Sequence, residues 1–232
     1  MAFNPVLMIM QPRQINESIN SLKNNIDIPK VWFRAYNEEN VQEEMNKFVR
    51  KTKFSHYIVM GDDGVVSKKA ADTILKYGEM QEYDVFTGWM NMHLEEDGSL
   101  SQISTVSQGI LSSHYDPVHG PTRKDYPKWL HVKWVKEQEG VIQTTMANYA
   151  MSMAERDIFL KFPLKTHPNG CSSDHHWSRR LQLAGLKVWT HPKAFIKHLR
   201  RGWKPLEDKW LVGTIPPKTI LDKMWLPREF YK

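Results

Sequence analysis

The sequence predicts an α/β protein with a central, mostly parallel mixed sheet and helices on both of its faces. Within the first 93 residues, short apolar runs of strand type alternate with segments whose apolar residues recur at helical spacing. Such alternation is typical of right-handed βαβ crossovers, which place helices over a parallel sheet. The composition of the 232 residues, 41% hydrophobic and 25% charged, is that of a globular protein with a sizeable core.

The first strands and helices follow one another closely. The apolar run Pro5–Met10 predicts a strand, and the loop Gln11-Pro12-Arg13 leads from it into a helix over Asn16–Lys23. The run Val31–Ala35 predicts the second strand. After a polar cluster, apolar residues at helical spacing predict a helix over Val41–Lys51.

A third strand is predicted at Tyr57–Met60, and it ends directly in Gly61-Asp62-Asp63-Gly64. Ser67 is suited to cap the N-terminus of the helix that follows, because its hydroxyl can accept from a backbone N–H of the first turn. The segment Asp84–His93 is strand-like again. These elements complete the alternation that predicts the parallel sheet.

The second half of the chain is less regular. A long loop rich in His, Pro and Tyr lies at Ser113–Tyr126, and loops of this length are more often functional than spare. The other elements expected here are a turn at Glu96–Ser99, strands at Ser101–Ser107, Gln143–Met153, Lys187–Thr190 and Ala194–His198, and helices at Glu155–Phe162 and His175–Ala184, the last ended by Gly185. We expect one domain over residues 1–202 and a basic tail, rich in Trp and Pro, over 203–232.

Charge is distributed unevenly along the chain, whose net charge is +6. Residues 1–116 carry 11 Lys and Arg against 16 Asp and Glu, whereas residues 117–232 carry 21 against 10. A basic half suits phosphate-bearing ligands, an anionic membrane surface or nucleic acid, and it equally suits a plain solvated surface.

Cysteine content and hydropathy bear on the cellular setting. Cys171 is the single cysteine, which excludes an internal disulfide framework and a multi-cysteine zinc module and predicts a reducing, intracellular setting. No stretch approaches the roughly 18 apolar residues of a membrane-spanning helix. The start, Met1–Met10, lacks the features of a signal peptide. A cytoplasmic protein is therefore expected.

Asp62 and Asp63 are the first candidates for chemistry. They directly follow a buried-type strand, and ligands of open α/β sheets bind beyond the carboxyl ends of the strands. Two adjacent carboxylates there suit a hard divalent cation that also holds a diphosphate. An ordinary Asp-Gly turn explains the same residues without any function.

Two further residues stand at the ends of predicted elements. Asp174 lies at the start of a helix, where it either caps the helix or serves as a carboxylate that accepts a proton from a hydroxyl. His198 ends a short apolar strand and is a candidate metal ligand, although a lone histidine near a strand end more often has a structural or surface role. The glycine signatures of dinucleotide-binding and P-loop proteins are absent from the sequence.

Four passages, taken in order, carry a family resemblance. They are PVLMIMQPRQINESINSL, HYIVMGDDGVVSKKAADTIL, NYAMSMAERDIFLKFPL and SSDHHWSRRLQLAGLKVWTHPKAFIKHLRRG. Together they resemble the GT-A-fold glycosyltransferases, and specifically the family-2-like enzymes that use nucleotide sugars. The resemblance covers most of residues 5–202 and leaves Leu94–Gln143 unmatched. It implies a Rossmann-like GT-A domain, with a nucleotide-binding half at about residues 1–93 and an acceptor half at about residues 94–202.

The resemblance also implies a metal and nucleotide site. Asp63 matches the last acid of the family's D-x-D motif, which binds the metal, and His198 matches the histidine that completes the metal site in many members. Asp62 matches the middle position, where nucleotide-sugar contacts are usual, while Gly61 stands where the family often has its first acid. The loops expected to flank the nucleotide contribute Pro12, Arg13 and Asn37.

The same resemblance implies a catalytic base. Asp174 matches the base of inverting members, and Ser173 takes the place of the other acid in the family's usual acidic pair. The hypothesis is thus a metal-dependent glycosyltransferase that moves a sugar from a UDP- or GDP-sugar to an acceptor hydroxyl with inversion. Imidazole as a ligand favours Mn²⁺ over Mg²⁺.

The expected partners are the nucleotide-sugar donor and a glycan, lipid-linked or protein acceptor. Peripheral contact of the basic tail with an anionic membrane is a further option, and no nucleic acid is expected as a partner. Two alternatives remain from the sequence: a nucleotidyltransferase on a related α/β fold, and a non-enzymatic nucleic-acid-binding module suggested by the basic half and its tryptophans.

Overall fold

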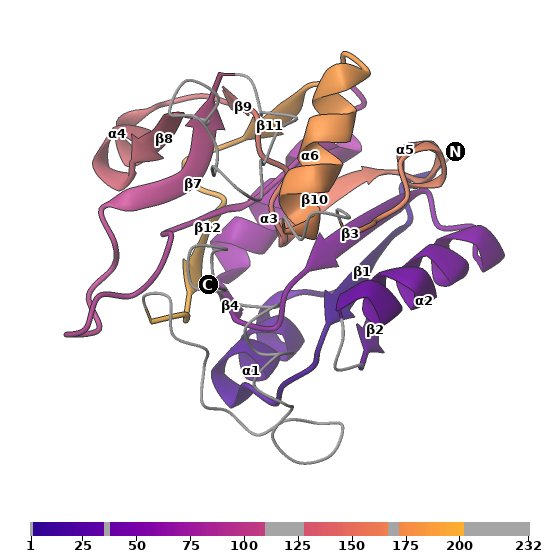
Figure 1. Cartoon of the computed structure of the whole chain (residues 1–232), viewed down its shortest axis with the longest axis horizontal. Helices are drawn as coiled ribbons and strands as arrows, with labels where there is room; N and C mark the ends of the chain where they lie inside the picture. Colours follow the sequence, from indigo (N-terminus) through magenta and orange to yellow (C-terminus); the bar gives the residue numbers. More distant parts are fainter. Residues whose placement is uncertain (1, 35–37, 110–127, 167–171, 202–232) are drawn as a thin grey trace, which may run out of the picture.

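The computed structural model describes residues 2–34, 38–109, 128–166 and 172–201, and a seven-stranded sheet forms its centre (Figure 1). Across the sheet the order is β2 (Lys30–Phe33), β1 (Pro5–Met10), β3 (His56–Met60), β10 (Ala150–Glu155), β5 (Val85–Phe86), β11 (Val188–Thr190) and β9 (Ile142–Thr144). Only β10 and β9 run against their neighbours, so the other five strands share one direction. The mostly parallel mixed sheet expected from the sequence is confirmed.

Helices cover both faces of this sheet (Figure 1). One face packs against α1 (Asn16–Asn25) and α3 (Lys68–Glu79), and the other against α2 (Glu38–Lys51), α5 (Arg156–Lys161) and α6 (Ser173–Leu183). In β1, Leu7 and Ile9 belong to the first core and Val6 and Met8 to the second, because successive side chains of a strand point to opposite faces. Burial on both faces is the reason that this strand reads as a continuous apolar run.

The helix ends follow the local sequence. The Ser67 hydroxyl accepts a hydrogen bond of 3.2 Å from the backbone N–H of Ala70 and so caps α3, as predicted. Gly185 follows α6 with a φ of 77°, a left-handed conformation that glycine adopts without strain. The Leu186 N–H then donates to the Leu181 carbonyl at 3.0 Å, which closes the last turn.

A second sheet of three strands brings the C-terminal part of the described chain back to the end of β3. It has the order β4 (Gly64–Val66), β12 (Phe195–His198), β6 (Trp89–Met90). β12 is antiparallel to β4, and their register places His198 opposite Gly64. The remaining elements are a strand pair, β7 (Ile103–Gln108) and β8 (Lys128–His131), and the short helix α4 (Val132–Glu137).

Two segments predicted as single strands are each divided. The segment Asp84–His93 forms β5 and β6, which belong to different sheets. The chain changes sheet at Gly88, where a Cβ atom would lie 2.3 Å from the Ala150 carbonyl oxygen. Likewise, the segment Gln143–Met153 contributes β9 and β10, which are separated by a turn. A close contact between distant parts of the chain decides the first break, and hydrophobic periodicity shows neither.

Several predictions fall on residues outside the described part of the chain. These are the loop Ser113–Tyr126, the residues Asn37 and Cys171, and the tail 203–232. The division of the chain at residue 202 therefore stays a prediction. Among the helices of the described segments, none is long and apolar enough to cross a membrane.

Candidate active site

Asp62 and Asp63 lie just beyond the end of β3, in the middle of the seven-stranded sheet. The two residues are only 4% and 6% exposed, respectively. Burying a carboxylate is costly unless cationic or hydrogen-bonding groups compensate for the lost hydration. The surroundings of these two acids therefore define the site.

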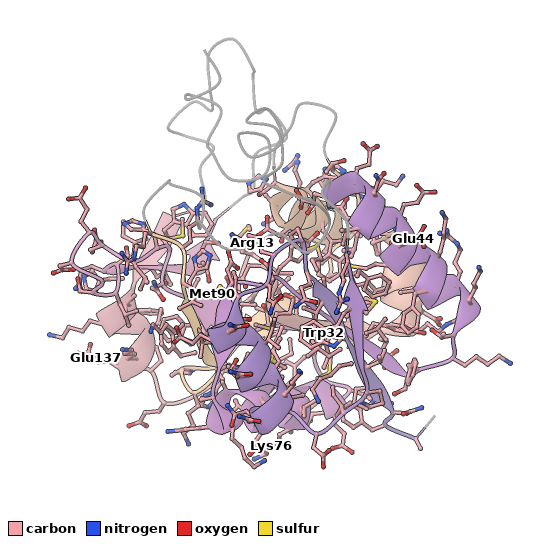
Figure 2. The ribbon with its side chains drawn as sticks, turned by 90° about the horizontal axis from the view of Figure 1, so that it is seen from below. Arg13, Trp32, Glu44, Lys76, Met90 and Glu137 are labelled. Carbon is pink, nitrogen blue, oxygen red and sulfur yellow. The ribbon has the colours of Figure 1, made fainter. Side chains whose placement is uncertain are left out.

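Arg13 provides the first compensation. It lies in the loop after β1, which runs parallel to β3, so the ends of the two neighbouring strands bring the arginine and the acids together. Its backbone N–H and its Nε donate to Asp62 Oδ2 at 3.0 and 3.1 Å, and its Nη2 donates to Asp62 Oδ1 and, at 3.2 Å, to Asp63 Oδ2. Arg13 is fully buried, near the middle of the molecule (Figure 2).

His198 provides the second compensation. Its Nε2 lies 3.3 Å from Asp63 Oδ2, and its Nδ1 lies 2.9 Å from the Met92 carbonyl oxygen. The backbone holds this pair from both sides: the Leu199 N–H donates to the Asp63 carbonyl at 2.9 Å, and the His198 N–H donates to Asn91 Oδ1 at 3.1 Å. The pairing of β12 with β4 thus delivers the histidine to the acid.

The two acids differ in how readily they hold a proton. Burial raises the pKa of Asp62, and the charge and hydrogen bonds of Arg13 oppose this effect. Burial acts in the same way on Asp63, but His198 together with Arg13 and Arg200 outweighs it and holds the pKa of Asp63 well below its ordinary value. Asp63 is therefore the acid that stays ionised.

The geometry of Asp63 and His198 fits a divalent cation. Because a carbonyl oxygen only accepts hydrogen bonds, the contact with Met92 places a proton on His198 Nδ1 and leaves Nε2 for a second proton or for a metal. Metal-binding histidines commonly donate their other N–H to a carbonyl in this way. Within the described segments, no group of three His, Cys, Asp or Glu residues could hold a metal ion, so a cation here needs further ligands from substrate or water.

A second group of polar side chains forms where α2 and α6 begin. Helix α6 starts at Ser173, so Asp174 lies within its first turn and not before it, and Asp174 Oδ1 accepts from the His175 N–H at 2.7 Å. Ser173 donates its hydroxyl to Glu38 Oε1, and Gln42 Nε2 donates to the same oxygen at 3.2 Å. Burial, followed by the charge of Asp174, raises the pKa of Glu38 to about 7 against these hydrogen bonds.

Tyr149 joins the two groups. Its carbonyl oxygen accepts from the N–H of Gly61 at 3.0 Å, directly before the acidic pair. Its hydroxyl oxygen is buried near the second group: burial, followed by the charges of Glu38 and Asp174, raises the pKa of this phenol well above 10. Two residues further on, Met151 has a φ of 61° at a bulge in β10 opposite β3. Bulges and strained backbone of this kind often lie next to active sites.

The structure brings most of the predicted residues together. Asp63 and His198 are adjacent, as expected for a shared metal site, and Pro12 lies buried next to Arg13. Arg13 and Asp62, both expected to face a nucleotide, are hydrogen-bonded to each other, and their contact with a nucleotide stays a prediction. Asn37 lies outside the described residues.

Two residues of the second group, Glu38 and Tyr149, were not anticipated as functional. Glu38 stands in a polar cluster after a strand, but this position alone does not indicate its role, because its partner Ser173 is 135 residues away. Tyr149 lies within a segment that reads as an ordinary strand, so the sequence gives no signal for its role.

A shallow cavity of about 400 Å³ lies elsewhere on the described surface. Residues near β7 and on α4 line it: Leu100, Ser101, Gln102, Val132, Lys133, Lys136 and Glu137. Glu137 lies at the edge of the molecule, away from Arg13 (Figure 2). This cavity takes no part in the site.

Comparison with known proteins gives a result for structure only. No protein-family model matches the sequence, and no curated protein matches it. The fold is similar to that of GalNAc-T7, solved with UDP, GalNAc and Mn²⁺, with a TM-score of 0.55 and 10% identity over 86% of this chain and 44% of that one. The chain has a GT-A-like fold. It spans less than half the length of GalNAc-T7.

A second solved structure, A197 from STIV, matches 93% of this chain and 99% of that one, with a TM-score of 0.48 and 12% identity. At identities of 10–12%, structural similarity concerns the arrangement of the backbone. Membership of the family-2-like group therefore stays a prediction.

Proposed function

We propose that this protein is a glycosyltransferase that moves a sugar from a nucleoside-diphosphate sugar to an acceptor hydroxyl. The observation that carries the proposal is the convergence of Asp63 and His198 beyond the carboxyl end of β3. His198 Nε2 lies 3.3 Å from Asp63 Oδ2, at the end of a GT-A-like sheet where ligands of such sheets bind. The similar protein GalNAc-T7 was solved with UDP and Mn²⁺, which supports a nucleotide and a cation at the corresponding edge here.

In this proposal Asp63 and His198 hold a divalent cation, with Mn²⁺ favoured by the imidazole ligand. When bound, the cation neutralises the charge that develops on the leaving diphosphate. Arg13 has a separate role, because it is already bound to Asp62 and holds that acid beside the cation site. Pro12, Arg13, Asn37 and Asp62 would shape the nucleotide side of the site, within the half formed by residues 1–93.

Asp174 is the proposed general base. It would accept the proton of the acceptor hydroxyl while the acceptor oxygen bonds to the anomeric carbon and the bond from that carbon to the diphosphate oxygen breaks. A single displacement of this kind inverts the configuration of the sugar. The position of Asp174 at the N-terminus of α6 supports the role, since the helix dipole favours an ionised carboxylate there.

Replacing Asp174 by Asn tests the base. A positioned base typically contributes about 10²–10⁴ in rate, so we expect D174N to lose sugar transfer by that factor while the affinity for the nucleotide is unchanged. Rates of nucleotide release from a panel of UDP- and GDP-sugars, with calorimetric titration of the nucleotide, measure both quantities. Retention of more than about a tenth of the wild-type rate would show that Asp174 is not the base.

The product identifies the reaction class. Chromatography of the reaction mixture should show free UDP or GDP as the released nucleotide. Pyrophosphate in its place would indicate the alternative, nucleotidyl transfer. Once the donor has been identified, it can be used to search for the acceptor, whether that is a glycan, a lipid-linked molecule or a protein.

A further inference from the structure

The first turns of α2 and α6 meet through one hydrogen bond. Glu38, the first residue of α2, accepts from the hydroxyl of Ser173, the first residue of α6, across 135 residues of sequence. Ser173 is fully buried and Glu38 is half-buried, which limits the access of water to this bond. Gln42, one turn along α2 and also buried, donates to the same Glu38 oxygen at 3.2 Å and fixes its orientation.

The next residue after Ser173 is Asp174. Its backbone carbonyl accepts from the Ser178 hydroxyl at 2.6 Å, and its side chain accepts from the His175 N–H, so both of these hydrogen bonds lie within α6 itself. The Ser173–Glu38 bond therefore ties the turn that carries Asp174 to another element of the fold. A carboxylate that must meet a reacting hydroxyl within hydrogen-bond reach depends on how well that turn is held.

We propose that Glu38 is a positioning residue for Asp174, acting through the buried hydroxyl of Ser173. This inference rests on the proposed function, in which Asp174 is the general base. Glu38 belongs to the half of the chain that is proposed to bind the nucleotide, and it fixes the position of the first turn of α6. Asp174, in that turn, acts on the acceptor. The bond thus links the two halves of the proposed site.

Electrostatics supports the same arrangement. Two neighbouring carboxyl groups repel each other when both are charged, so one of them takes up a proton more readily. Glu38 is that group, since burial and the charge of Asp174 raise its pKa. Tyr149, which comes from the turn before β10, also faces both acids, and its own raised pKa keeps its hydroxyl neutral. A neutral Glu38 still accepts the hydrogen bond from Ser173.

Four variants separate positioning from charge. Glu38→Gln keeps an oxygen that can accept from Ser173 but cannot ionise. Glu38→Ala and Ser173→Ala each remove the hydrogen bond by deleting one of its two partners. The double variant loses the same single bond. Glu43→Gln is the matched control, because Glu43 lies on the same helix but is exposed and pairs with Lys47.

The first readout is steady-state release of UDP from UDP-N-acetylgalactosamine and UDP-glucose in the presence of Mn²⁺. We expect Glu38→Ala and Ser173→Ala each to lower kcat by about 10- to 100-fold with KM for the donor changed less than about twofold, because misplacement of a catalytic group by about 1 Å costs up to about 100-fold. The double variant should be no slower than the singles, and Glu38→Gln should stay within about threefold of the wild type.

The second readout is hydrogen exchange of the backbone amides in the first turn of α6, measured without nucleotide. Faster exchange in Glu38→Ala and Ser173→Ala, but not in Glu38→Gln or Glu43→Gln, supports positioning whether or not the donor is correct. Unchanged exchange in Glu38→Ala, an unchanged kcat, or a double variant slowed by the product of both single effects would overturn it. If the wild type releases no nucleotide from these two sugars or from the GDP-sugars of the panel, the proposed function is at fault, and the exchange data alone decide the positioning.

Discussion

Buried charge dominates the chemistry of single residues in this protein. Arg13, Asp62 and Asp63 are all buried, and the arginine donates to both acids. Such a group is stable only while its charges are matched, because removal of one partner leaves the others desolvated and uncompensated. The same arrangement holds Asp63 ionised and directed at His198, which links the stability of the fold to the proposed cation site.

Replacing Arg13 by Leu should therefore be strongly destabilising. We expect the free energy of unfolding, from urea titration at pH 7, to fall by about 3–5 kcal/mol, the usual cost of breaking a buried ion pair from one side. Lys47→Met is the control: Lys47 forms exposed pairs with Glu43 and Glu44, and their loss should leave the free energy of unfolding nearly unchanged. A loss below about 1 kcal/mol for Arg13→Leu would mean that the acids are not held as described.

Glu38 gives a prediction for pH. Its pKa is raised from 4.5 to about 7 by burial and by Asp174, so between these values the folded protein holds a proton that the unfolded chain has released. Wild-type stability should consequently fall as the pH rises from about 4.5 to about 7, and Glu38→Gln should remove this component.

Urea titrations across this range measure the effect. The variant should gain on the wild type by roughly 1–3 kcal/mol between pH 4.5 and 7 and no further above that range. Glu43→Gln, at an exposed position of the same helix, should show no such gain. A difference between Glu38→Gln and wild type that is independent of pH would contradict the raised pKa.

At the scale of elements, close approaches between strands decide where the chain turns. The clearest case is Gly88, between β5 and β6, where a Cβ atom would lie 2.3 Å from the Ala150 carbonyl oxygen and 2.8 Å from Ile196 Cδ1. Ala150 begins β10, and Ile196 lies in β12, the strand that ends at His198. Glycine at this place allows the seven-stranded sheet and the three-stranded sheet to meet beside the site.

Gly88→Ala should separate these sheets and destabilise the protein. The added methyl group meets backbone, which cannot move aside as a flexible side chain can, so we expect a loss of about 1–3 kcal/mol in the free energy of unfolding. Gly140→Ala is the control, because nothing lies within 4 Å of a Cβ atom there. Equal stabilities of the two variants would contradict the close approach.

The elements also show what the sequence could predict. β1 was predicted with its observed bounds, because a strand buried on both faces is an uninterrupted apolar run between polar loops. The break at Gly88 was missed, because it depends on a contact with Ala150, 62 residues later. Asp63 and His198 could be anticipated from their places at strand ends, whereas Glu38 could not, since its role depends on Ser173 across 135 residues.

At the scale of the whole molecule, the fold gathers groups from both ends of the described chain at one edge of the sheet. Arg13 follows the first strand, the acidic pair follows β3, and His198 ends the last strand. The GT-A-like fold was predicted from the order of four sequence passages and agrees with the similarity to GalNAc-T7. We expect the choice of sugar and acceptor to depend on the loop Leu94–Gln143, part of which lies outside the described residues.

The central claim is the proposed cation site, and a calorimetric titration of the 232-residue chain with UDP, and with GDP in parallel, tests it most directly. We expect one of the two nucleotides to bind only when Mn²⁺ is present, and this binding to be lost in both Asp63→Ala and His198→Ala. Asp97→Ala, in an exposed turn, should bind as the wild type does. Failure of both nucleotides to bind with Mn²⁺, or binding that survives in both site variants, would contradict the proposed site.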